Sequence, residues 1–155
     1  MQSTIRSVGL GVVMVAMLIL TLTIEVNAQN AKRVDVWKDP FCGCCAKWID
    51  QMKAAGFEMR VHDTQSLHAI KKKHGIPQRL QSCHTAKVGG YVVEGHVPIA
   101  DVQRLLKQKP NVIGISVPGM PLGSPGMEVS SGEKEPYEVL TFDKEGATSA
   151  FAKHN

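Results

Sequence analysis

The sequence has few aromatic residues and little excess of either charge. Phe, Trp and Tyr make up 5% of its 155 residues, and the formal net charge is +4. Its one compact basic run, Lys71-Lys72-Lys73, falls in an expected helix and is interpreted as a solvated face. A basic surface for nucleic acid normally has aromatic side chains among its positive charges, so nucleic acid is excluded as a partner. Internal repeats and low-complexity tracts are also absent from the sequence.

The sequence also lacks an apolar run long enough for a comfortable membrane span. Residues 8–22 are apolar and uncharged, but a transmembrane helix needs about 20 such residues. Arg6 precedes this run, and Val26-Asn27-Ala28 follows it with small side chains at the two positions that a signal peptidase reads. We therefore expect residues 1–28 to be a signal peptide and residues 29–155 to be one exported domain that is not inserted in the membrane. An uncleaved amino-terminal anchor is the alternative.

Cysteine is scarce and unevenly placed. Three of the four cysteines lie in Cys42-Gly43-Cys44-Cys45, and Cys83 is the fourth. A second, separated C-x-x-C pair, which would favour a zinc site, is absent. Exported proteins meet oxidising conditions, so structural disulfides are one interpretation. A chain that needed only a disulfide staple would, however, space its cysteines apart.

Hydrophobic periodicity and turn residues predict an α/β domain. Strands are expected over 34–37 and 57–61, helices over 46–55 and from about Ser66 to Gly75, a hairpin around Gly89-Gly90 and a third helix from Pro98. A βαβ unit followed by a ββα unit is the thioredoxin arrangement. Beyond Pro110 the pattern loosens into an irregular extension rich in proline, glycine and methionine, with candidate strands at 113–117 and 137–142.

The cysteine cluster falls on the turn between the first strand and the first helix. Cys42 and Cys45 have the C-x-x-C spacing of a redox pair, and a helix amino terminus stabilises thiolate. A redox pair needs only two sulfurs, whereas three on one turn, joined by Cys83, suit a soft metal. Thiolate ligands without zinc spacing favour copper(I). A redox dithiol of Cys42 and Cys45, structural disulfides and zinc remain alternatives.

Other candidate ligands are less specific. His84 follows Cys83, and the two can share a metal only if the strand begins after Cys83 or is irregular, because adjacent strand residues point to opposite faces. Met120 and Met127 lie in Pro-Gly turns and are candidate thioether ligands, although methionine more often fills a core. His96 is a weaker candidate. Exposed or packing roles are expected for His62, His68, His74 and His154.

Four ordered motifs resemble those of one family. They are Cys42-Gly43-Cys44-Cys45, Ser82-Cys83-His84-Thr85 and the segments 91–98 and 118–127. They are similar to the CopG-like family of periplasmic copper-resistance proteins, formerly known only as a domain of unknown function. The resemblance runs from about residue 34 to residue 142. It implies a thioredoxin-like fold, a periplasmic location, a role in copper tolerance and copper binding by Cys42, Cys44, Cys45 and Cys83.

The sequence therefore predicts a periplasmic copper(I)-binding protein that works with other copper-handling proteins of that compartment. The alternative is an oxidoreductase that exchanges disulfides through Cys42 and Cys45 or changes the oxidation state of copper. Whether the protein is an enzyme stays open at this level. A disulfide-stapled interaction module is the third interpretation.

Overall fold

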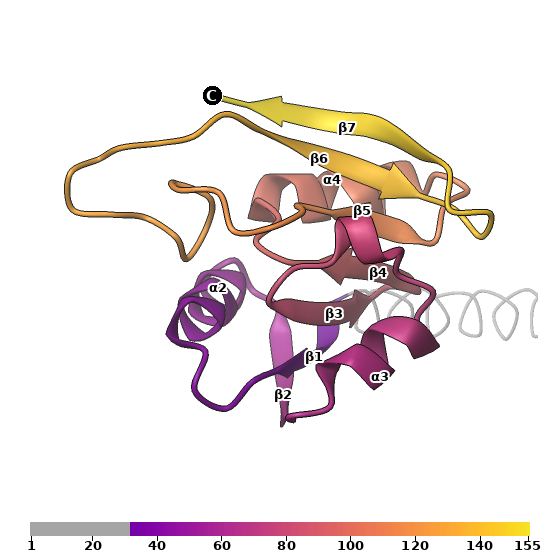
Figure 1. Cartoon of the computed structure of the whole chain (residues 1–155), viewed down its shortest axis with the longest axis horizontal. Helices are drawn as coiled ribbons and strands as arrows, with labels where there is room; N and C mark the ends of the chain where they lie inside the picture. Colours follow the sequence, from indigo (N-terminus) through magenta and orange to yellow (C-terminus); the bar gives the residue numbers. More distant parts are fainter. Residues whose placement is uncertain (1–31) are drawn as a thin grey trace, which may run out of the picture. The chain divides into compact units, whose positions relative to one another are not determined.

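A seven-stranded sheet with helices packed on it is formed by residues 32–155, the part of the chain that the computed structural model describes (Figure 1). The expected signal peptide, residues 1–28, lies outside the described residues. Within 32–155, no helix is both long and apolar enough to cross a membrane. The elements in chain order are β1 (Arg33–Lys38), α2 (Gly43–Ala54), β2 (Glu58–Asp63), α3 (Leu67–Lys73), the 3₁₀ helix η1 (Gln78–Leu80), β3 (His84–Val88), β4 (Tyr91–Glu94), α4 (Ile99–Gln108), β5 (Gly114–Ser116), β6 (Tyr137–Phe142) and β7 (Thr148–His154).

The sheet is mixed, with the strand order β2-β1-β3-β4-β5-β6-β7. β1 runs parallel to β2 and antiparallel to β3, and β3 and β4 form an antiparallel hairpin. Gly89 and Gly90 close this hairpin with φ angles of 55° and 91°, which glycine adopts without steric cost. The mixed α/β class and the expected order of strands, helices and hairpin up to residue 110 are thus confirmed.

The carboxy-terminal part is more regular than the sequence predicts. Both candidate strands form, as β5 and β6, and a further strand, β7, pairs with β6. The irregular extension that the sequence predicts is therefore wrong at Thr148–His154, where β7 forms, and holds for the long segment between β5 and β6. β7 escapes detection because Thr148–His154 lacks the alternation of buried and exposed residues, since most of its side chains are exposed.

Among residues 32–155 the hydrophobic core has two clusters, one on each face of the sheet. Val93 belongs to the larger cluster and Val92 to the smaller, and adjacent strand residues point to opposite faces. The larger cluster packs α2, through Trp48 and Met52, and α4 against β1, β3 and β4. The larger cluster therefore holds α2 against the sheet near the end of β1 and the start of β3, where the cysteines lie.

The prediction that Lys71-Lys72-Lys73 forms a solvated face is wrong for Lys71. Lys71 is 5% exposed, and its ammonium group pairs with the buried carboxylate of Glu94. Lys72 and Lys73 are exposed, as expected. The sequence pattern conceals this because the ion pair joins α3 to β4, two elements that are far apart in the chain.

Candidate metal and thiol site

The first three cysteines lie at the amino terminus of α2. A turn after β1 leads into the helix, with the amide of Cys42 donating to the carbonyl of Asp39 at 3.1 Å. Cys42 is the N-cap residue in an extended conformation, and Cys44 and Cys45 lie in the first helical turn. The positive end of the helix dipole therefore faces these sulfurs, which favours the thiolate form. The helix begins three residues earlier than the periodicity predicts.

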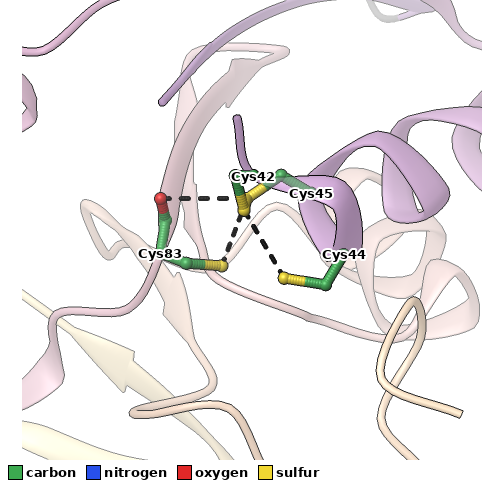
Figure 2. Close-up of side chains that lie close together, drawn as sticks. All are labelled: Cys42, Cys44, Cys45 and Cys83. Carbon is green, nitrogen blue, oxygen red and sulfur yellow. Dashed lines mark hydrogen bonds between the residues drawn. A yellow bond between two sulfur atoms is a disulfide. The ribbon is translucent and has the colours of Figure 1, made fainter. Parts of the chain in front are cut away.

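All four sulfurs come together, as Figure 2 shows. Cys42 and Cys45 form a disulfide, and Cys44 and Cys83 are free. The sulfur of Cys44 lies 3.4 Å from that of Cys42, and the sulfur of Cys83 lies 3.4 Å from that of Cys45. Each free thiol thus flanks one end of the disulfide, and all four Sγ atoms lie within 4.8 Å of one another. The expected approach of Cys83 to the cysteine turn is present.

Strand pairing explains this approach. In the antiparallel register of β1 and β3, Lys38 lies opposite His84. The end of β1, which leads into the cysteine turn, is therefore beside the start of β3, which Cys83 precedes. Cys83 lies outside the strand, so the alternation of side chains does not separate it from His84, and the sulfur is 3.3 Å from Nδ1 of His84.

His96 is a closer neighbour of Cys83 than the sequence indicates. Its Nε2 atom lies 2.8 Å from the Cys83 sulfur, and its Nδ1 lies 2.7 Å from the carbonyl oxygen of Pro125. A carbonyl oxygen only accepts, so Nδ1 carries the proton and Nε2 presents a lone pair to Cys83. A histidine held in this way has the arrangement typical of a metal ligand.

The hairpin register was the signal that could have identified His96. Thr85 pairs with Glu94 and Val88 with Tyr91 on either side of the glycine turn. Continuing this register by two residues sets Cys83 opposite His96. The glycine pair alone therefore predicts the contact once the hairpin is accepted.

Burial favours the uncharged forms of the Cys83 thiol and of both histidines. Burial, with the nearby Cys44 as the next cause, raises the pKa of the Cys83 thiol to about 12. Burial also lowers the pKa of His84 well below its usual value, with His96 as the next cause, and lowers the pKa of His96. Ionising the Cys83 thiol therefore requires a compensating positive charge, which a metal cation provides.

His84 is fully buried, and its ring lies 4.5 Å from that of Trp48. Its Nε2 atom has no hydrogen-bond partner among residues 32–155. A buried nitrogen without a partner is costly, and such atoms are found at sites that bind ligands. Cys83, His84 and His96 form a second group of ligand atoms that shares its sulfur with the four-cysteine group.

The segment 118–127, which carries Met120 and Met127, approaches the site through its backbone. Gly126 has a φ of 89°, and a Cβ atom there would lie 2.6 Å from the carbonyl oxygen of Cys44. Met120 is 51% exposed, and Met127 is half-buried. Met120 and Met127 stay candidate ligands. The histidines expected in other roles have other neighbours: His62 contacts Asp35, and His154 contacts Asp101.

The chain is similar to one family model and to two solved structures. The family model "Protein of unknown function, DUF411" matches residues 80–127, which include Cys83, His84 and His96. No curated protein matches the chain. Two solved structures, "Copper resistance protein copG" Form 1 and Form 2, are each 39% identical to it and cover 79% of it. The match spans 96% and 98% of those chains, with TM-scores of 0.74 and 0.75. The chain therefore belongs to the CopG family of copper resistance proteins.

Proposed function

We propose that the protein is a periplasmic copper(I)-binding protein whose site is formed by Cys42, Cys44, Cys45 and Cys83 and which contributes to copper tolerance. The observation that carries the proposal is the convergence of the four sulfurs within 4.8 Å, with Cys83 brought from a distant part of the chain. The copper assignment is supported by the solved relatives, whose name is that of a copper resistance protein.

The donor set fits copper(I). Thiolate sulfur is the soft ligand that this ion prefers, and the neutral nitrogens of His84 and His96 adjoin Cys83 without adding charge. Cys42 and Cys45 bind only after their disulfide is reduced, because the thiolate is the ligand form of cysteine. Each thiol that binds releases its proton, so binding acidifies the medium. The positive end of α2 then stabilises the thiolates that face it.

The cellular setting is part of the same proposal. Residues 1–28 direct export and are removed, and residues 29–155 act as one domain with a thioredoxin-like arrangement. The strand order β2-β1-β3-β4, with β2 parallel and β3 antiparallel to β1, supports this arrangement. In the periplasm the domain receives copper from, or passes it to, other copper-handling proteins.

The Cys42–Cys45 disulfide favours a second candidate function, that of a thiol oxidoreductase. In this reaction a dithiol protein gives two electrons and two protons to the disulfide. The partner leaves with a new disulfide, and Cys42 and Cys45 become thiols. Oxidation of two copper(I) ions to copper(II) would supply the same two electrons. Neither reaction needs Cys44 or Cys83 as an electron carrier.

Anaerobic competition between the reduced protein and a copper(I) chelator tests the leading proposal. We expect Cys44→Ser and Cys83→Ser to weaken copper(I) binding by at least about tenfold, because each removes one soft ligand. The exposed His68→Gln variant on α3 is the control for a substitution away from the site. Equal affinity in parent and cysteine variants would contradict the proposal. Disulfide exchange that survives both variants but not Cys42→Ser would favour the oxidoreductase.

A further inference from the structure

Two opposite charges are buried between α3 and the end of β4. Lys71 and Glu94 form an ion pair at 2.5 Å, and their side chains are 6% and 0% exposed. Thr85 lies between them: its hydroxyl accepts from Lys71 at 3.1 Å and donates to Oε2 of Glu94 at 2.7 Å. The carboxylate of Glu94 is therefore held in one position by two partners.

The same carboxylate has a third partner, the backbone of the residue before Cys83. Oε1 of Glu94 accepts the amide proton of Ser82 at 2.7 Å. The Ser82 hydroxyl donates to the carbonyl of Gly119, and the bare α-carbon of Gly95 packs against the Ser82 side chain, where a Cβ atom would lie 2.5 Å from that of Ser82. The backbone just before Cys83 is thus fixed by contacts with two separate parts of the chain.

Stability by itself does not explain a buried ion pair. Removing two charges from water costs several kcal/mol per ion, and apolar residues of similar volume often leave a protein equally stable. The Ser82 amide, in contrast, is a donor just outside β3 that needs an acceptor at this point. An apolar residue at position 94 would fill the same volume without accepting this hydrogen bond.

From these contacts we propose that Glu94 is a positioning residue for Cys83. It accepts the Ser82 amide and thereby sets where the Cys83 sulfur lies relative to Cys45 and His96, and Lys71 keeps the carboxylate in place. The inference deepens the proposed copper function and rests on it, because it assigns a role to the segment that delivers the fourth sulfur.

Two double variants separate the hydrogen bond from the charges. Lys71→Met/Glu94→Gln and Lys71→Met/Glu94→Met both lack the ion pair, and their residues at position 94 are similar in length. Only glutamine offers an oxygen to the Ser82 amide. Any electrostatic effect of the lost charges on Cys83 is the same in both variants. A difference between them therefore reports on the hydrogen bond.

The readout is the rate at which iodoacetamide alkylates Cys83 in metal-free protein. In a Cys44→Ser background with the Cys42–Cys45 disulfide intact, Cys83 is the one free thiol of the chain, and peptide mapping verifies the modified residue. We expect alkylation to be about tenfold faster with methionine at position 94 and within about twofold of the background with glutamine, because one hydrogen bond to the backbone is lost or kept.

Urea unfolding of each variant distinguishes positioning from a general loss of stability. Equal alkylation rates in the two double variants, or rates that follow only the free energies of unfolding, would overturn the inference. If the methionine variant does not fold, Glu94→Asp replaces it, because the shorter side chain keeps the charge and moves the acceptor away from the Ser82 amide. An alkylation rate equal to that of the Cys44→Ser background would then overturn the inference. Because the assay contains no copper, its failure is distinct from failure of the parent to bind copper(I).

Discussion

Cys83 and His96 lie opposite each other at the open end of the β3–β4 hairpin, with the Cys83 sulfur 2.8 Å from Nε2 of His96. The other ring nitrogen of His96 donates to the carbonyl of Pro125, so the ring links the thiol to the long segment between β5 and β6. This segment packs its backbone at Gly126 against the first turn of α2. The hairpin, the segment between β5 and β6 and the first turn of α2, which are distant in sequence, therefore meet around the Cys83 sulfur.

His96→Ala is expected to weaken copper(I) binding by about 10- to 100-fold, because it removes a nitrogen beside Cys83 and the link to Pro125. Competition with a copper(I) chelator measures the affinity. His62→Ala is the matched control, since His62 lies on β2 and contacts Asp35. Equal losses in the two variants would show that the effect is not specific to the site.

Gly126→Ala is expected to destabilise the protein more than Gly132→Ala. Both glycines have positive φ, 89° and 74°, so both substitutions carry a backbone strain of about 1 kcal/mol. Only at Gly126 would the new Cβ atom collide with backbone, 2.6 Å from the Cys44 carbonyl oxygen, whereas nothing lies within 4 Å at Gly132.

Urea unfolding measures the difference between these two glycine variants. We expect Gly126→Ala to lose about 1–3 kcal/mol more than Gly132→Ala, which is the usual cost of overpacking. The collision also pushes the segment away from α2, so copper(I) affinity should fall in Gly126→Ala and stay at the parent value in Gly132→Ala. Equal stability in the two variants would mean that this segment does not pack against the helix in solution.

Reduction of the Cys42–Cys45 disulfide is expected to raise the affinity for copper(I) by at least about tenfold, because it converts two unavailable sulfurs into thiolate ligands. The measurement compares anaerobic titrations of the oxidised protein and of protein reduced and then freed of reductant. Thiol counting before each titration verifies the redox state. Identical titration curves would indicate that copper binds without Cys42 and Cys45.

The stability of the metal-free protein is expected to fall as the medium becomes more acidic than about pH 6.5. Burial lowers the pKa of His84 well below 6.5, so the ring stays neutral in the folded state while the unfolded chain takes up a proton. The stabilisation is complete above the unfolded pKa. It is lost at up to about 1.4 kcal/mol per pH unit as the pH falls toward the folded pKa.

A variant without this titrating ring isolates its share of the pH dependence. His84→Leu should reduce the loss of unfolding free energy between about pH 6.5 and 5.5 by about 1 kcal/mol. Between about pH 7.5 and 8.5 the ring is neutral in both states, so parent and variant should have parallel profiles there. Parallel profiles over the whole range would show that His84 is not buried in the neutral form.

The fold was predictable where its cause is local. The alternation at Val34 and Val36, the helical spacing of Trp48, Ile49 and Met52 and the glycine pair of the hairpin all reflect periodicity within one element. β7 and the burial of Lys71 were not predictable in this way, because each depends on a partner, β6 or Glu94, supplied by another element.

By itself, the sequence determined the chemistry available to this protein: soft sulfur ligands on a strand-to-helix turn, with one more before a hairpin, because residue types and short spacings are written along the chain. Only the tertiary structure decided which of these groups meet. The register of β1 against β3 brings Cys83 to the cysteine turn, and the segment between β5 and β6 packs on α2 and contacts His96. Such contacts are decided by strand pairing and burial, which arise only when distant segments pack together.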